Sequence, residues 1–151
     1  MLILVDTNVL LRVIEPKHSQ HQDALTAIRM LRQAEHELCV CPQIHYEFWV
    51  AATRPAAQNG LGLAPGDATA LLQRFGPPWI RLLRDERTIY EHWRELVATY
   101  HVQGKQAHDA RLVAAMLRHG VRCLLTFNQA DFQRYSSIQL IDPRRAESTQ
   151  L

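Results

Sequence analysis

Four acidic residues of this 151-residue chain stand where they could act together chemically: Asp6, Glu47, Asp109 and Asp131. Asp6 directly follows the aliphatic run Leu2–Val5, so its carboxylate would lose hydration on folding unless a cation or several backbone donors compensated. Two carboxylates roughly 4 Å apart repel each other by about 4 kcal/mol at an effective dielectric constant near 20. If these four acids converge, the cluster requires a cation.

The ligand types in such a cluster favour a particular class of ion. Carboxylate oxygens without thiolates select a hard cation, Mg²⁺ or Mn²⁺, over Zn²⁺. A bound ion of this kind polarises a phosphoryl oxygen and lowers the pKa of a water molecule. The acidic residues are therefore suited to the hydrolysis of phosphodiester bonds.

Short apolar segments alternate along the chain with segments of helical periodicity. Leu2–Val5 is apolar throughout, which is typical of a strand buried on both faces of a parallel sheet. Strands are predicted at residues 2–5, 37–41, 79–83, 121–127 and 138–141, and helices at 7–14, 20–36, 42–54, 67–75, 88–101 and 107–119. This alternation gives βαβ units with right-handed crossovers, hence an α/β fold in which a parallel sheet of about five short strands is sandwiched by helices.

The length of the chain predicts a single domain over residues 1–151, because domains usually contain roughly 100 to 200 residues. A hydrophobic content of 47% is enough to fill one core of this size. Residues 55–66 contain three Gly and two Pro and are predicted to form a long loop within the domain. Residues 143–151 are predicted to form a polar C-terminal tail.

Composition excludes several classes of protein. Seventeen Lys and Arg against fifteen Asp and Glu give a formal charge of +2, which is too balanced to infer a nucleic-acid partner from charge alone. The apolar N-terminal run is too short for a signal peptide or a membrane span, so we expect a cytoplasmic protein that does not bind membranes. Three cysteines, an odd number, argue against a disulfide scaffold.

The predicted sheet suggests where a site would lie. Ligands of open parallel sheets bind beyond the carboxyl ends of the strands, and Asp6, Asn128 and Asp131 follow two such ends. Asp109 stands in the first turn of a predicted helix, where an acid also has a purely structural role because it interacts favourably with the helix dipole. Glu47 precedes two aromatic residues on a helix, and it could equally lie on a solvated edge.

Four segments of the sequence resemble the PIN-domain nucleases and, within them, the VapC-type toxins of bacterial toxin–antitoxin pairs. They are residues 2–8 (LILVDTN), 46–49 (YEFW), 108–115 (HDARLVAA) and 125–132 (LTFNQADF). The segments occur in the family's order, and the likeness extends from Leu2 to about Ile141. The resemblance implies a Mg²⁺-dependent endoribonuclease on a parallel sheet between helices. It also implies a homodimer that a cognate VapB-like antitoxin holds inactive.

The same resemblance assigns roles to individual acids. Asp6, Glu47 and Asp109 fall on the acidic metal-site positions of the family, with Asp6 and Asp109 as the most direct metal ligands. Asp131 completes the catalytic set, although many members carry an acid at the position that is Asn128 here. The amide oxygen of Asn128 could accept a hydrogen bond from a metal-bound water but supplies no charge.

Three further residues, Thr7, Asn8 and Thr126, resemble positions that orient the carboxylates through hydroxyl or amide contacts. Helix capping and turn formation are the alternative roles for them.

Two sets of side chains could contact nucleic acid. Aromatic residues that could stack on bases or fill the core are Phe48, Trp49 and Trp93, and basic residues that could hold phosphates are Arg12, Arg54, Arg81 and Arg111.

Other sites and functions are weaker alternatives. Cys39 with Cys41, and His18 with His21, have spacings that could bind a metal, but core packing and surface exposure account for them better. A phosphatase with Asp6 as covalent nucleophile would need a second acid at position 8, which is Asn8. A non-catalytic PIN-like interaction module and a stand-alone RNA-processing nuclease without an antitoxin stay open.

Overall fold

A computed structural model describes residues 1–148 and confirms the predicted α/β fold. Five parallel strands form one sheet in the order β3-β2-β1-β4-β5. The strands are β1 (Leu2–Val5), β2 (Glu37–Val40), β3 (Arg81–Leu82), β4 (Cys123–Leu125) and β5 (Gln139–Ile141). All of β4 and most of β1 and β2 are buried, as expected for strands covered on both faces.

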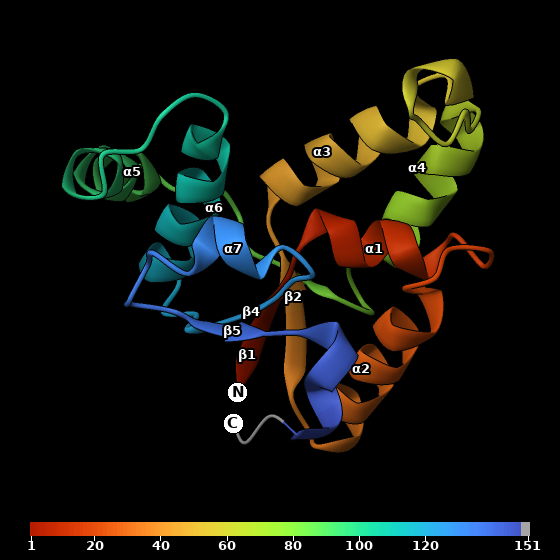
Figure 1. The fold of residues 1–151 in the computed structure, drawn as a ribbon, viewed down its shortest axis with the longest axis horizontal. Helices are drawn as coiled ribbons and strands as arrows, with labels where there is room; N and C mark the ends of the chain where they lie inside the picture. The colour runs from red at the N-terminus through yellow and green to blue at the C-terminus, as the bar shows by residue number, and fades with distance from the viewer. Residues whose placement is uncertain (149–151) are drawn as a thin grey trace.

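Helices cover both faces of the sheet. In Figure 1, α5 and α6 lie on one side of it and α1 and α2 on the other. The helices are α1 (Thr7–Val13), α2 (His21–Gln33), α3 (Pro42–Thr53), α4 (Pro65–Arg74), α5 (Thr88–Thr99), α6 (Gln106–Arg118) and α7 (Gln129–Phe132), with the 3₁₀ helices η1 (Ala56–Gln58) and η2 (Pro143–Ser148). Within residues 1–148, none of these helices combines the length and apolarity that crossing a lipid bilayer requires.

The core joins the sheet to the helices that carry the acidic residues. Ile3, Leu4 and Val5 of β1 are fully buried, and Phe48 of α3 packs edge-on against Phe75 with 5.3 Å between ring centroids. One face of α6 is also buried, because Val113 and the residues next to it in the helix are fully buried. Helices held in this way have fixed positions relative to the strand ends.

Several predicted boundaries differ from the structure. The strand predicted at residues 79–83 shrinks to Arg81–Leu82, because the N–H groups of Trp79 and Ile80 donate to the carbonyl of Gly76 in a turn. The strand predicted at 121–127 contracts to Cys123–Leu125, since the N–H of Val121 donates to Met116 at the end of α6. Helix α7 was not predicted at all.

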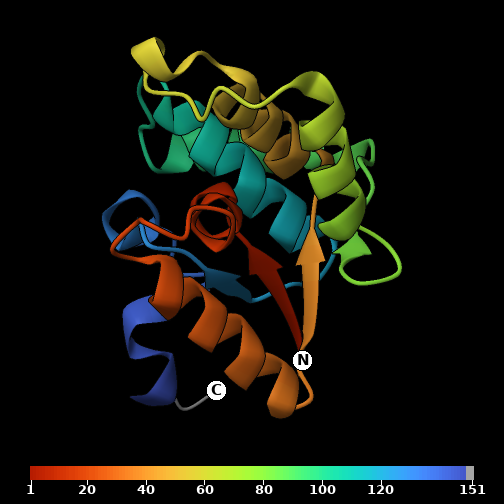
Figure 2. The ribbon, with the colours of Figure 1, turned by 90° about the vertical axis from the view of Figure 1, so that its right-hand side faces the viewer.

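The predicted polar tail is ordered over residues 143–148. These residues form η2, which packs beside α2 in both Figure 1 and Figure 2, and Pro143 is buried. Arg144 pairs with Asp142 and lies over the ring of Phe127, with 6.0 Å between its guanidinium carbon and the ring centroid. Residues 149–151 of the predicted tail lie outside the described residues.

Candidate metal centre

The strand order reverses at β1, which has β2 on one side and β4 on the other. In open parallel sheets, such a reversal leaves a crevice at the carboxyl ends of the strands. The arrowheads of β1 and β2 in Figure 2 point toward α3 and α6, the helices that carry Glu47 and Asp109. Asp6 follows β1 directly, and its N–H donates to the carbonyl of Leu125 in β4 over 3.0 Å. Asp6 therefore stands at the switch point.

Hydrogen bonds hold the Asp6 carboxylate in one orientation. Its Oδ1 accepts from the backbone N–H of Thr7 at 2.7 Å. Its Oδ2 accepts from Asn8 Nδ2 and Thr126 Oγ1, each at 2.6 Å. Asp6 is only 5% exposed, so these donors replace much of the water that the carboxylate loses on folding.

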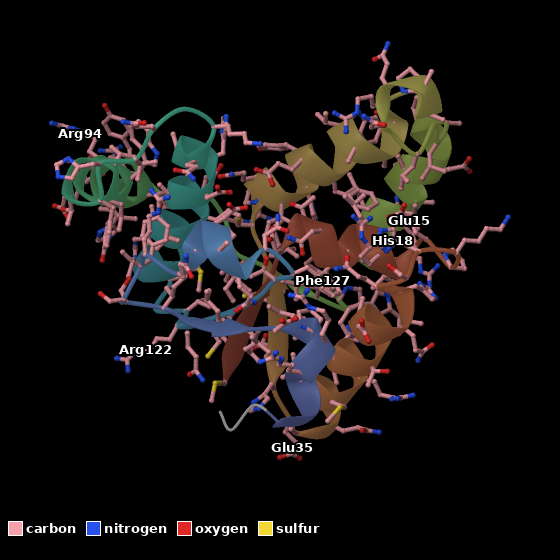
Figure 3. All side chains as sticks on the ribbon, viewed as in Figure 1. Glu15, His18, Glu35, Arg94, Arg122 and Phe127 are labelled. Atoms are coloured by element: carbon pink, nitrogen blue, oxygen red, sulfur yellow. The ribbon has the colours of Figure 1, made fainter. Side chains whose placement is uncertain are left out.

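Thr126 is the centre of this network. Its hydroxyl donates to Asp6 and accepts from Asn8 Nδ2 at 3.1 Å and from the N–H of Asn128 at 3.0 Å. Asn8 Oδ1 in turn accepts from the N–H of Phe127 at 3.1 Å, and Figure 3 shows Phe127 near the middle of the molecule, close to α1. The geometry supports the orienting roles predicted for Asn8 and Thr126. Asn128 contributes its backbone, whereas its side chain is exposed.

Glu47 joins the same network from α3. Its Oε2 accepts from the hydroxyl of Thr7 at 2.9 Å, and its Oε1 accepts from Gln43 Nε2 at 2.7 Å. Thr7 thus binds Asp6 through its backbone and Glu47 through its side chain. Glu47 is partly buried, and because both of its carboxylate oxygens accept hydrogen bonds, this geometry favours the site over the solvated-edge alternative. It also lines a groove of about 420 Å³ that runs along α3 toward Arg54, with His108 of α6 on the other wall.

Electrostatics link the four acids. Burial raises the pKa of Asp6 to about 6, hydrogen bonds from Thr126 and Thr7 lower it, and the charges of Glu47 and Asp109 raise it. Burial also raises the pKa of Asp109 to about 6, together with the charges of Asp131 and Glu47. Each acid therefore lies in the field of at least one other.

This donor set fits a hard cation that keeps part of its hydration shell. Among residues 1–148, no three His, Cys, Asp or Glu side chains lie close enough together to coordinate one ion directly. Mg²⁺ usually retains several waters and takes one or two protein carboxylates. Burial and the charges of the other acids disfavour the ionised forms of Asp6 and Asp109. A bound cation would therefore stabilise these two carboxylates the most.

Three residues of the site were missed in the sequence. Gln43 is 6% exposed and binds Glu47, from which it is separated by four residues, the spacing of neighbours on one helix face. That spacing was a usable signal. Lys105 and His108 lower the pKa of Asp109 through their charges. Both precede Asp109 by no more than four residues, Lys105 as the N-cap residue of α6 and His108 within its first turn.

The cysteine and histidine pairs that could have bound a metal serve the fold instead. Cys39 and Cys41 are buried free thiols, and burial raises the pKa of Cys39 to about 12 and that of Cys41 to about 11, so thiolates are disfavoured there. His18 Nδ1 accepts from the N–H of Gln20, and His21 Nδ1 lies 2.7 Å from the carbonyl of Arg12. These histidine contacts shape the connection between α1 and α2.

Among the aromatic and basic candidates, few approach the acids. Phe48 is fully buried, Trp49 packs on the core, and Trp93 Nε1 donates to the carbonyl of Ala107. Arg12 pairs with Glu15 and Arg81 pairs with Glu37, away from the site. Arg54 and Arg111 are nearer: Arg54 lines the groove beside Glu47, and Arg111 donates to Gln43 Oε1 at 3.2 Å.

Replacing Thr126 with valine is expected to weaken the site without unfolding the protein. The change leaves Asp6 Oδ2 without its hydroxyl donor, which should destabilise the fold by about 1–3 kcal/mol and lower metal affinity by about 10- to 100-fold. Calorimetric titration with Mn²⁺ and urea unfolding measure the two effects. Thr126→Ser should behave like the wild type, as should Thr69→Val, which removes a hydroxyl bonded to Pro65 on α4. Undiminished Mn²⁺ affinity in Thr126→Val would contradict the orienting role.

Comparison with known proteins agrees with the fold. The sequence model of the PIN domain matches residues 3–137. A search of curated proteins gives no significant sequence match.

Solved structures similar in fold include toxins and toxin–antitoxin complexes. VapBC2 from Rickettsia felis bound to a promoter DNA fragment superimposes with a TM-score of 0.70 at 12% identity, covering 93% of this chain and 98% of that chain. DNA-bound VapBC from Salmonella typhimurium gives 0.66 at 19% identity, covering 95% and 99%. VapC20 from Mycobacterium tuberculosis, a toxin that cleaves the sarcin–ricin loop, gives 0.65 at 15% identity, covering 88% and 95%. These likenesses establish the fold.

Proposed function

Because the chain belongs to the PIN-domain family, we propose that it is a Mg²⁺-dependent endoribonuclease and the toxic component of a VapBC-like toxin–antitoxin pair. The observation that carries the proposal is the buried Asp6 carboxylate at the switch point, in the field of Glu47 and Asp109. The fold shared with VapC20, a toxin that cleaves the sarcin–ricin loop, supports RNA as the substrate.

Asp6 and Asp109 would hold the ion, Mg²⁺ or Mn²⁺, which supplies positive charge for a phosphoryl oxygen and a water of lowered pKa. The network of Thr7, Asn8 and Thr126 keeps the Asp6 carboxylate aimed in one direction. Glu47 is a candidate to accept the proton of the attacking water at a carboxylate oxygen.

Asp131, whose charge acts on Asp109, completes the acidic set in this proposal, with Asn128 exposed beside it. In-line attack of water on the phosphorus with departure of the 3′ oxygen would leave products with 5′-phosphates. The groove along α3 offers the RNA strand a path to the acids, and Arg54 lies along it to hold a phosphate.

Two protein partners belong to the same proposal. The first is a second copy of the chain, with which it would form a homodimer. The second is a VapB-like antitoxin, for which a groove of about 410 Å³ lined by Ile28, Phe75 and Ile80, with Arg32 and Arg74 beside them, is a candidate surface. Similar structures are complexes with antitoxins, which supports such a partner.

Cleavage of total RNA and single-stranded DNA tests the nuclease. The purified protein is expected to cut RNA in Mg²⁺ but not in excess chelator, and Asp6→Asn should be inactive under both conditions. Cleavage should weaken steeply as salt is raised if phosphate contacts dominate binding. Cleavage that persists in Asp6→Asn or in chelator would overturn the assigned site. A folded protein that binds no divalent cation would instead be an interaction module.

A further inference from the structure

Gln43 occupies a buried position between the two helices that carry Glu47 and Asp109. It lies in the first turn of α3, and only 6% of its surface is exposed. Its Nε2 donates to Glu47 Oε1 at 2.7 Å and to the backbone carbonyl of His108 in α6 at 2.9 Å. Its Oε1 accepts from Arg111 at 3.2 Å. All the polar atoms of this side chain thus have partners that belong to, or flank, the acidic cluster.

These partners permit one orientation of the amide and one residue type. With the amide reversed, the carbonyl oxygen would face two acceptors, Glu47 Oε1 and the His108 carbonyl, and the NH₂ group would face the guanidinium of Arg111. A glutamate at position 43 would still accept from Arg111 but would have no N–H to donate to the other two groups. The donor at Gln43 is therefore the feature to test.

The contacts also tie α3 to α6. The carbonyl of His108 immediately precedes Asp109, so the Gln43 bond fixes the backbone beside one predicted ligand while the other bond fixes Glu47. Arg111 is anchored in turn by Asp85, with 3.0 Å between Nη2 and Oδ1. Buried amides with every partner satisfied restrict neighbouring groups more firmly than exposed ones.

We infer that Gln43 is a positioning residue that holds Glu47 toward Asp6 and Asp109 and thereby sets the affinity of the acidic cluster for a divalent cation. This inference rests on the metal site of the proposed function. It adds a residue that does not ligate the ion and that acts through Glu47.

Direct binding of Mn²⁺, followed by electron paramagnetic resonance, measures this role without any need for turnover. Gln43→Met keeps the size of the side chain but removes both donors, and we expect about a 10- to 100-fold rise in the Mn²⁺ dissociation constant. Gln43→Glu should weaken binding similarly, because it also lacks the donors. The matched control is Gln73→Met on the exposed face of α4, which should bind Mn²⁺ like the wild type.

A double-mutant cycle separates positioning from packing. If Gln43 acts through Glu47, Gln43→Met should change Mn²⁺ affinity by less than about twofold once Glu47→Gln is present, whereas independent roles would make the two effects add. Additive effects, or wild-type Mn²⁺ affinity in Gln43→Met with unchanged far-ultraviolet circular dichroism, would overturn the inference.

The RNA cleavage assay distinguishes failure of this inference from failure of the proposed function. If the wild-type protein binds Mn²⁺ but does not cleave RNA, the proposed nuclease activity is wrong, and the Gln43 measurement is still valid. Suppose instead that the wild type cleaves RNA and that Gln43→Met needs no more Mg²⁺ than the wild type for half-maximal rate. The proposed role of Gln43 would then be wrong, while the proposed nuclease activity would stand.

Discussion

Asp109→Asn is expected to lower the rate of RNA cleavage by about 10³-fold or more while leaving the protein folded. Charge stabilisation by a catalytic metal ion is worth several kcal/mol, and about 4 kcal/mol corresponds to a factor of 10³ in rate. Asparagine keeps the shape of the side chain but removes the charge that would hold the ion. Single-turnover cleavage of a defined RNA at saturating enzyme measures the loss.

The stability of the same variant distinguishes a metal ligand from a helix-terminal acid. Burial and the charges of Asp131 and Glu47 raise the pKa of Asp109 to about 6. The ionised carboxylate that Asp109 carries at neutral pH therefore destabilises the folded protein. In chelator at pH 8, Asp109→Asn should therefore melt at a higher temperature than the wild type. A helix-dipole role predicts the reverse, a lower melting temperature.

Asp67 provides the matched control for this comparison. It stands in the first turn of α4, as Asp109 does in α6, but it is exposed. Asp67→Asn should slightly lower the melting temperature and leave cleavage unchanged. If both variants lose a similar small amount of stability and both still cleave RNA, then Asp109 is an ordinary helix-terminal acid.

The sequence predicts the sheet and part of the site because both depend on local patterns. The continuous apolar run Leu2–Val5 predicts β1, and an acid directly after it lies at the carboxyl edge in any parallel arrangement. Gly120 also predicts the end of α6, where its φ of 66° requires the conformation that glycine adopts easily. Each of these inferences needs only a few neighbouring residues.

The parts that were missed depend on contacts between distant segments. Helix α7 has only four residues, too few for a helical period, and it forms where the chain leaves β4. Residues Pro143–Ser148 look polar in sequence, yet they are held against α2 by tertiary packing. Gln43 owes its role to α6, which follows more than sixty residues later, as shown by its bond to the His108 carbonyl.

The stability of the metal-free protein is expected to fall as pH rises, because of Asp6. Its pKa is raised from 3.8 to about 6 in the folded protein, first by burial, so between these values the unfolded chain releases a proton that the folded chain keeps. The free energy of unfolding therefore decreases from about pH 4 upward, and the full loss of about 3 kcal/mol is reached above the folded-state pKa. A hard cation at Asp6 should restore stability at neutral pH, by an amount that grows with its concentration.

Urea unfolding of the wild type and of Asp6→Asn in chelator, from pH 4 to pH 8, isolates this effect. Asparagine at position 6 loses hydrogen bonds to Asn8 or Thr7 at every pH, so the stability curve of the variant is shifted by a constant. The carboxyl of Asp6 titrates only in the wild type. Asp109, whose pKa is also raised to about 6, and Asp142, whose pKa burial raises but hydrogen bonds from Arg144 lower overall, titrate in both proteins, so their contributions cancel in the difference. As pH rises, the wild type should lose about 3 kcal/mol of unfolding free energy relative to Asp6→Asn, so the two curves should converge or cross. Parallel curves would mean that Asp6 ionises in the folded protein as easily as in water, and that nothing at the switch point demands a cation.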